Sequence, residues 1–353
     1  MLWKFFKLLG VRSRTWYLLG IAAVGQATAW GQSAPGTTVY SVPNIFEPHS
    51  GSANLLYSIS LFTLEITGAI FVVVAGLWLY VIVRFRNEDQ LSEPPQIYGS
   101  AQIELSWTVI PILIVVVLFL TTARILFAVQ DRPAPPGALH VDVVGHQFWW
   151  EFRYRKYGFV TANELHVPVS PPRAAEPTYL TLLSGDVDHS FWVPALFGKI
   201  DSIPNKVNSM WFDPDTTGIY LGQCAQFCGT AHAQMLLRVY VQTPEDFAAW
   251  LKNQEAPAVQ DPSVAQGRQI FESQSCVSCH AIRGTAAHGT YGPDLTHMMS
   301  RDTLASGVIA NNLANLKSWI KDPQAIKPGS MMPAMQLSDE QIDQVAAYLS
   351  TLK

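Results

Sequence analysis

The sequence predicts a multidomain membrane protein with a two-helix transmembrane hairpin, an all-β domain and a smaller all-α domain. Its 353 residues are enough for two or three domains. Hydrophobic residues make up 49% of the chain and charged residues 14%, which is too apolar for an ordinary soluble protein. After two long apolar runs come segments in which apolar and polar residues alternate, and then helix-start signals, which predict the all-β and all-α domains. The net charge of −4 gives no reason to expect a nucleic-acid partner.

Residues 1–29 have the pattern of a secretory signal peptide. Basic residues from Lys4 to Arg14 precede a short apolar run, and small residues follow at Ala27-Thr28-Ala29. An uncleaved membrane anchor is the alternative. Residues 30–53 are rich in Gly, Ser, Pro and Thr, so we expect an exposed N-terminal segment there.

Residues 54–130 are expected to form a transmembrane helical hairpin. The apolar runs Leu55–Val83 and Leu105–Val129 each exceed the roughly 20 residues that a helix needs to cross a bilayer. Arg84 directly follows the first run, as positive charges do at a cytoplasmic exit. Both ends of the hairpin are therefore expected outside the cytoplasm, and Pro111 is expected to kink the second helix.

Residues 131–252 read as a small β-sandwich or barrel. Strand-like segments begin near His140, Phe148, Tyr179, Ile219 and Met235, with Pro, Gly and Asp clusters between them. Thr243 followed by Pro244 predicts the start of a short closing helix.

Four side chains able to bind a metal lie within twelve residues, namely Cys224, Cys228, His232 and Met235. Thiolate, imidazole and thioether together select a soft or borderline metal, copper above all. A pair of copper ions bridged by both thiolates would explain the second cysteine. A Cys224–Cys228 disulfide and a structural zinc site are the alternatives, although zinc has no use for a thioether.

The run Cys224-Ala-Gln-Phe-Cys-Gly-Thr-Ala-His-Ala-Gln-Met235 resembles the copper A loop of cytochrome c oxidase subunit II. That family has a cupredoxin-like Greek-key domain, and it takes a further histidine from a segment similar to residues 188–194. The resemblance implies a dinuclear copper A centre with ligands from His189, Cys224, the Gln226 carbonyl, Cys228, His232 and Met235. Gln226 replaces the family's usual Glu, and a neutral amide is a weaker ligand for the hard cation that this Glu helps to bind.

Residues 253–261 form a predicted linker to a second cofactor domain at 262–353. Cys276-Val-Ser-Cys279-His280 is the attachment pattern of a c-type haem, with a redox dithiol or chance occurrence as the alternative. Two thioethers would fix the porphyrin and His280 would bind the iron. Ser338 and Gln341 predict a capping box at the start of the last helix.

The region around this pattern resembles a small class I cytochrome c with one covalently bound haem. In that family a proline carbonyl, here that of Pro293, orients the iron-binding histidine. The family's sixth ligand is the methionine before a proline, which selects Met332, with Met331 and Met335 as rivals and Met298 and Met299 as distant ones. Histidine and thioether ligation raises the haem potential, as suits an electron carrier.

Two further positions carry roles in the resembling family. The carboxylate at the position of Glu104 lies there at the cytoplasmic mouth of a proton pathway, whereas an interfacial helix-capping charge is the alternative here. An aromatic residue next to the copper, usually Trp, is implicated there in receiving electrons. Phe148 stands at this position, and core packing is the commoner fate of an aromatic residue in a strand.

The whole chain after the signal resembles subunit II of a haem-copper oxidase with a fused cytochrome c, the caa type. This implies the subunit through which electrons enter a respiratory oxidase in the bacterial inner membrane, with the copper and haem domains on the periplasmic side. Its partners would be cytochrome c or an equivalent donor, the haem-copper subunit I that reduces oxygen with proton pumping, and other oxidase subunits. No catalytic residue is expected in this chain.

Three other functions are alternatives to this one. A copper A nitric oxide reductase would use the same relay, and a membrane-tethered redox or copper-binding protein would catalyse no turnover. A quinol oxidase subunit is disfavoured because it would not need the copper ligands. The hairpin and Glu104 favour docking to a large membrane enzyme.

Overall fold

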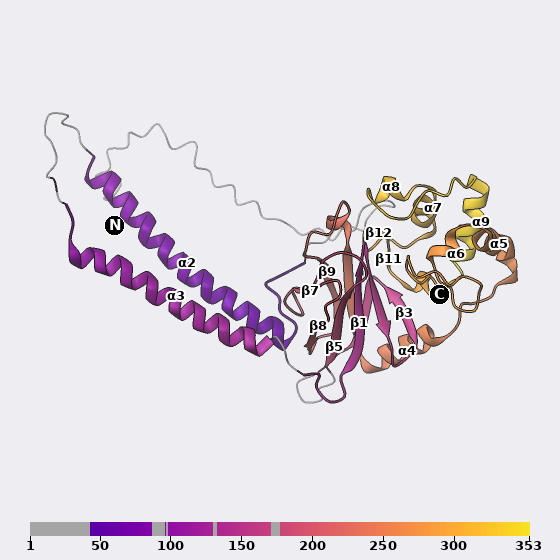
Figure 1. Ribbon diagram of the computed structural model, residues 1–353, viewed down its shortest axis with the longest axis horizontal. Coiled ribbons are helices and arrows are strands. Elements are labelled where there is room, and N and C mark those ends of the chain that lie inside the picture. Colours follow the sequence, from indigo (N-terminus) through magenta and orange to yellow (C-terminus); the bar gives the residue numbers. More distant parts are fainter. Residues whose placement is uncertain (1–42, 87–95, 97, 130–132, 171–176) are drawn as a thin grey trace, which may run out of the picture. The chain divides into compact units, whose positions relative to one another are not determined.

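A computed structural model describes residues 43–86, 96, 98–129, 133–170 and 177–353 (Figure 1). The predicted signal peptide at 1–29 and residues 30–42 of the predicted exposed segment lie outside the described residues. The predicted domain boundaries stay predictions, and the elements below are given as the structure has them.

Two long helices, α2 (Gly51–Arg84) and α3 (Ala101–Val129), form the predicted hairpin segments. Both are long and apolar enough to cross a membrane. The hydroxyl of Ser50 caps α2 by accepting a hydrogen bond from the Ala53 N–H at 3.0 Å. Pro111 lies inside α3 as expected.

Two five-stranded sheets form the cupredoxin-like β-sandwich that follows the hairpin (Figure 1). The first has the order β3 (Phe159–Ala162), β2 (Trp149–Tyr154), β1 (Leu139–His146), β5 (Thr178–Ser184) and β8 (Asn208–Phe212). The second has the order β4 (Glu164–Pro168), β10 (Leu236–Gln242), β9 (Gly218–Cys224), β6 (His189–Trp192) and β7 (Ile200–Ser202).

Alternation of buried and partly exposed residues explains why these segments form strands. In β10, residues at every second position are buried, because alternate side chains point to opposite faces of a strand. Trp150, Phe152 and Phe191 are fully buried in the core that joins the two sheets. The pairs β1–β5 and β4–β10 are parallel, and the other pairings in the two sheets are antiparallel.

The helix α4 (Pro244–Glu255) closes the sandwich at the place that the sequence predicts. Thr243 is its N-cap and accepts a hydrogen bond from the Asp246 N–H, and Pro244 occupies the first helical position. This helix packs Phe247 into the sandwich core.

The C-terminal domain is mainly helical, as predicted, and contains one two-stranded ladder in addition. Its elements are η2 (Pro262–Val264), α5 (Ala265–Ser273), α6 (Cys276–Cys279), η3 (Met298–Ser300), β11 (Thr303–Leu304), β12 (Ile309–Ala310), α7 (Leu313–Lys321), α8 (Pro323–Ile326) and α9 (Asp339–Leu349). The predicted capping box of Ser338 and Gln341 starts α9.

A glycine allows α5 and α9 to cross closely. A Cβ on Gly267 would lie 1.9 Å from the backbone oxygen of Gln344, so no larger residue fits without movement. Next to this crossing, the rings of Phe271 and Tyr348 lie 6.0 Å apart and pack against each other.

Candidate metal and haem sites

Residues 224–235, which we call the metal loop, run from the end of β9 to the start of β10. Backbone hydrogen bonds fix the base of this loop. The Cys224 N–H donates to the Met235 carbonyl at 2.9 Å, which joins the two ends of the loop. The Ala225 N–H donates to the carbonyl of Ser190 at 2.9 Å, which fastens the loop to β6. The short helix η1 (His232–Gln234) lies within this loop. The loop is therefore held by two strands of a rigid sheet.

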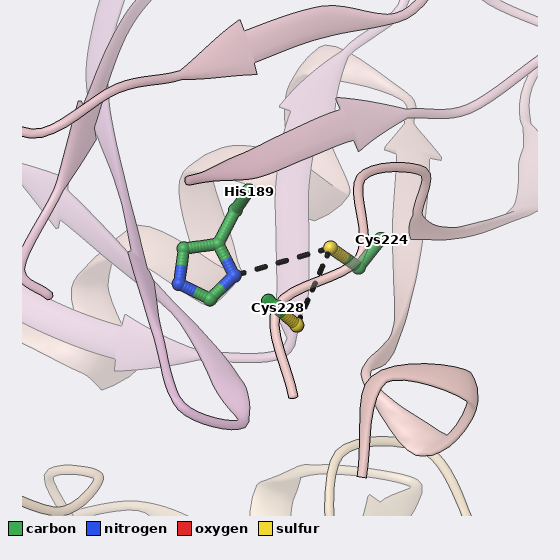
Figure 2. Close-up of side chains that lie close together, drawn as sticks. All are labelled: His189, Cys224 and Cys228. Atoms are coloured by element: carbon green, nitrogen blue, oxygen red, sulfur yellow. Dashed lines mark hydrogen bonds between the residues drawn. The ribbon is translucent and has the colours of Figure 1, made fainter. Parts of the chain in front are cut away.

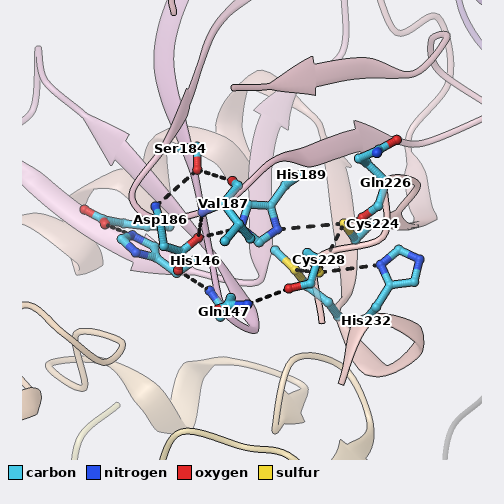
Figure 3. Close-up of polar contacts among 12 residues, drawn as sticks. His146, Gln147, Ser184, Asp186, Val187, His189, Cys224, Gln226, Cys228 and His232 are labelled. Atoms are coloured by element: carbon cyan, nitrogen blue, oxygen red, sulfur yellow. Dashed lines mark hydrogen bonds and ion pairs between the residues drawn. The ribbon is translucent and has the colours of Figure 1, made fainter. Parts of the chain in front are cut away.

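The donor atoms of the other predicted copper ligands lie close to the sulfur atoms of Cys224 and Cys228. Figure 2 shows His189 beside the two cysteines, and Figure 3 adds Gln226 and His232. The Sγ atoms of Cys224 and Cys228 lie 3.9 Å apart. The distances from the other donors to the nearer sulfur are 3.9 Å for His189 Nδ1, 3.2 Å for the Gln226 carbonyl oxygen, 3.5 Å for His232 Nδ1 and 3.9 Å for Met235 Sδ.

This set of donors fits copper better than the alternatives. Both cysteines are free and buried, so the Cys224–Cys228 disulfide is not formed. Met235 is fully buried with its thioether against Cys228, where zinc would not use it. Two thiols, two imidazoles, a thioether and a carbonyl suit a soft metal.

The two thiols ionise as a pair. A hydrogen bond between them lowers the pKa of one thiol, that of Cys224, and raises the pKa of the other, that of Cys228. A neighbouring thiolate makes the second deprotonation unfavourable in the metal-free chain. A bound cation would remove this penalty, because metal ligands bind as thiolates.

Asp186 orients His189, the predicted ligand that comes from β6. Its Oδ1 lies 2.8 Å from His189 Nε2, so that Nδ1 points toward Cys224 (Figure 3). Burial opposes the charged imidazole, but hydrogen bonds with Asp186 and Cys224 outweigh burial and raise the pKa of His189. Gly145 leaves room for this ring, because a Cβ there would lie 2.7 Å from His189 Cδ2.

A cavity in the C-terminal domain gathers the predicted haem-binding residues. Cys276, Cys279, His280 and Met332 all line it. His280 Nδ1 lies 2.7 Å from the carbonyl oxygen of Pro293, as expected for the orienting bond. Nδ1 therefore carries the hydrogen and Nε2 is left for a metal. Burial lowers the pKa of His280, which favours the neutral, iron-binding form. The two thiols and the imidazole thus suit a covalently held haem.

Models of known protein families match three segments of the chain. The transmembrane domain of cytochrome c oxidase subunit II matches residues 45–125, and the periplasmic domain of the same subunit matches residues 172–242. A cytochrome c family model matches residues 264–353. Cytochrome c oxidase subunit 2 of Alkalihalophilus pseudofirmus is 35% identical, over 87% of this chain and 90% of the relative.

The chain belongs to the cytochrome c oxidase subunit II family, with a fused cytochrome c domain. The subunit 2 of Bacillus sp. strain PS3 is 36% identical, over 76% of this chain and 80% of the relative. The solved periplasmic domain of subunit II of Bradyrhizobium japonicum cytochrome oxidase is 29% identical, covers 35% of this chain and 97% of that chain, and has a TM-score of 0.32.

Membership of the subunit II family makes this chain a subunit of a cytochrome c oxidase. The periplasmic-domain match implies copper and the cytochrome c match implies a c-type haem. The matched transmembrane domain and the two apolar helices agree with a membrane-anchored subunit that works beside other oxidase subunits.

Glu104, Phe148 and Met332 are the other residues of this subunit II sequence for which a role was predicted. Glu104 lies in the first turn of α3 and is exposed, and its proton-pathway role stays a prediction. Phe148 is 7% exposed and packs in the sandwich core, where a Cβ on Gly229 of the metal loop would lie 2.9 Å from its Cζ. The choice of Met332 also stays a prediction, because Met331 and Met335 line the same cavity.

Sequence reasoning missed Asp186 and Gln147, which support the subunit II metal site. The Gln147 side chain donates a hydrogen bond to the Cys228 carbonyl at 2.6 Å, and its backbone N–H donates to Asp186 at 2.6 Å (Figure 3). Asp186 lies three residues before His189 in a turn, and this spacing was the available signal. Gln147 had none, since it is brought to the loop only by folding.

Proposed function

We propose that this chain is the subunit through which electrons enter a proton-pumping terminal oxidase. Electrons from cytochrome c or an equivalent donor would pass through its own c-type haem and a dinuclear copper A centre to the haem-copper subunit that reduces oxygen to water. The observation that supports this most strongly is the set of four donors around a pair of cysteine sulfur atoms 3.9 Å apart. When bound, the two cofactors supply reversible one-electron chemistry.

The copper ligands we propose are His189, Cys224, the Gln226 carbonyl, Cys228, His232 and Met235. Cys224 and Cys228 are 3% and 4% exposed, so they would exclude water from a metal held between them. Asp186 holds the imidazole of His189 in one orientation. A site that is rigid and dry before an electron arrives needs little rearrangement when its charge changes.

For the haem we propose covalent attachment at Cys276 and Cys279, with His280 and Met332 as the axial ligands. The Pro293 carbonyl fixes the histidine ring, and apolar residues such as Phe271 and Leu316 line the cavity. An apolar cavity limits water access to the iron and thereby tunes its potential.

We propose a bacterial inner-membrane location with both cofactor domains on the periplasmic side. Arg84 in the last turn of α2 supports a cytoplasmic loop between the two helices. Glu104 is close in sequence to that loop, so its carboxylate would face the cytoplasmic proton supply.

Purification of the native complex tests this function. We expect oxygen uptake with reduced cytochrome c, together with copper and haem bound to this chain. Nitric oxide reduction without oxygen uptake would instead favour a nitric oxide reductase. Zinc, or no copper, in the purified chain would contradict the metal assignment.

Cys228→Ser should abolish the copper A centre, because a hydroxyl does not replace a bridging thiolate. We expect complete loss of the mixed-valence electron-resonance signal while the haem absorption persists. Ser190→Ala changes a buried residue next to His189 that is not itself a proposed ligand, and it should keep the signal. A seven-line pattern retained in Cys228→Ser would contradict the bridging role.

A further inference from the structure

Two buried charged side chains connect the copper-binding sandwich to the cytochrome domain. Glu164 of β4 is 2% exposed, and Lys327, which follows α8, is 4% exposed. Neither residue belongs to the proposed copper or haem ligands. Burying a charged group costs several kcal/mol unless hydrogen bonds compensate it, so their partners matter.

The partners of Glu164 lie in the other domain. Its Oε1 accepts hydrogen bonds from the Thr303 N–H at 2.9 Å and the Thr303 hydroxyl at 2.8 Å. Both carboxylate oxygens are within 3.1 Å of the Asp302 N–H. Close by, the Tyr240 hydroxyl donates to Asp302 Oδ2 at 2.6 Å. The cytochrome domain therefore solvates a carboxylate of the sandwich.

Lys327 makes the reciprocal contact. Its Nζ donates to the carbonyl of Phe148 in the sandwich at 2.7 Å and to that of Ala305 at 3.2 Å. The Ser306 hydroxyl lies 3.0 Å from the same Phe148 carbonyl. In the backbone, the Leu236 N–H of β10 donates to the Ser306 carbonyl at 3.2 Å.

The tip of the β11–β12 ladder is strained where it meets the sandwich. Ala305 and Ser306 have φ values of 53° and 63°, in the left-handed region that residues with a side chain disfavour. Such strain persists where the surroundings determine the conformation. Ser306 is 3% exposed, so the tip is shaped to fit against the sandwich.

This contact brings the two candidate cofactor sites together. The haem cavity is lined by Gln147, Phe148 and Trp149 of the sandwich as well as by cytochrome residues. Gln147 in turn donates to the carbonyl of Cys228 in the metal loop (Figure 3). After Lys327, a Cβ on Gly329 would lie only 2.7 Å from the Thr230 Cβ, so the predicted haem-ligand loop touches the metal loop.

We propose that Glu164 and Lys327 form a dock that fixes the cytochrome domain on the sandwich and positions the haem cavity against Gln147. The dock consists of these two residues together with Asp302, Thr303 and Ser306. Buried polar contacts of this kind define one register of two surfaces, since any other register leaves a buried polar group without a hydrogen-bond partner. Burial also lowers the pKa of Lys327 to about 7, and an uncharged amine keeps two hydrogens for its two carbonyl acceptors.

The electron-transfer part of this inference rests on the proposed function, whereas the docking part does not. With both cofactors bound as proposed, the transfer would be a one-electron step that oxidises a reduced haem and reduces an oxidised copper centre. It forms and breaks no bond. Glu164 and Lys327 are positioning residues, because they act through the placement of Gln147 and the cavity.

Hydrogen–deuterium exchange on the full-length chain tests the dock at a distance from each change. Lys327→Met should speed exchange of the Asp302 and Thr303 amides, which contact Glu164, by about tenfold or more. Glu164→Gln should speed exchange of the Leu236 amide by a similar factor, although this amide contacts neither Glu164 nor Lys327. Lys321→Met and Glu245→Gln, at exposed positions of the two domains, are the matched controls and should change neither.

Tyr240→Phe provides a milder variant that keeps the ring and removes the hydroxyl that bonds to Asp302. It should raise exchange of the remote Leu236 amide by a smaller factor, and it keeps the test usable if a charge variant fails to fold. Exchange that rises only at the direct neighbours of each substitution would overturn the dock.

Photochemical reduction of the haem in the purified oxidase tests the positioning role. We expect reduction of the copper centre to slow by about tenfold or more in Lys327→Met, with unchanged absorption and electron-resonance spectra of both cofactors. An unchanged rate in a variant whose remote amides exchange faster would overturn the positioning role. If the unaltered chain transfers no electron, the proposed function fails, and the exchange experiment still decides the dock.

Discussion

Asp186 connects the two candidate sites at the level of a single side chain. One carboxylate oxygen contacts His189 of the metal site, and the other accepts from the backbone N–H of Gln147, which lines the haem cavity. Loss of this carboxylate would therefore free both a proposed copper ligand and a residue of the cavity wall.

Met332→Ala should remove the low-spin spectrum of a haem with histidine and methionine ligands, because no thioether would remain at the sixth position. The haem should stay attached through Cys276 and Cys279. Absorption and magnetic circular dichroism of the reduced chain measure this change. Met331→Ala is the matched control and should keep the spectrum. An unchanged spectrum in Met332→Ala would identify Met331 or Met335 as the ligand.

Sequence alone could predict those site residues that lie within short patterns. Cys224 to Met235 and Cys276 to His280 are each contiguous, so their chemistry can be read from spacing. His189 comes from another strand and required a family resemblance. Glu164 and Lys327 are polar residues that would ordinarily be exposed, and only the folded arrangement buries them.

At the scale of elements, the α5–α9 crossing depends on Gly267. Gly267→Ala should destabilise the cytochrome domain by about 3 kcal/mol or more, because the new methyl group would meet the backbone of Gln344 and force the helices apart. Denaturant unfolding followed by haem absorption measures this effect.

Gln266→Ala is the control for this prediction, since it changes an exposed neighbour in the same helix. It should shift the free energy of unfolding by less than about 0.5 kcal/mol. A similarly small shift for Gly267→Ala would mean that the helices can separate at little cost.

The elements themselves were easier to predict than their arrangement. Alternation predicted the strand at β10, and apolar length predicted α2 and α3. The parallel pairing of β1 with β5 and of β4 with β10 joins segments far apart in the sequence, and local patterns carry no information about it.

At the scale of the whole molecule, acid should destabilise the fold through His166. This ring is 8% exposed, stacks on Tyr240 and Trp250, and pairs through Nδ1 with Gln242. Burial lowers the pKa of His166 from 6.5 to about 4, so between these values the unfolded chain binds a proton that the folded chain does not. Stability should therefore fall by about 3 kcal/mol as the pH falls from 6.5 to 4.

Thermal unfolding of the purified chain between pH 4 and 6.5, followed by tryptophan fluorescence, measures this slope. His166→Phe keeps an aromatic ring in the stack and should flatten the slope, although it lowers stability by leaving Gln242 unpaired. His140→Phe, at an exposed histidine of β1, should leave the slope as it is. Equal slopes in the two variants would contradict the role of His166.

The free state of Cys224 and Cys228 has a consequence for the maturation of this subunit. Their sulfur atoms are close enough that oxidation would need only small side-chain movements, and a bond between them would occupy both bridging ligands. The proposed covalent attachment of haem would likewise need the thiols of Cys276 and Cys279 in their reduced form. In an oxidising compartment, formation of the proposed sites would therefore require both thiol pairs to be reduced before either cofactor is delivered.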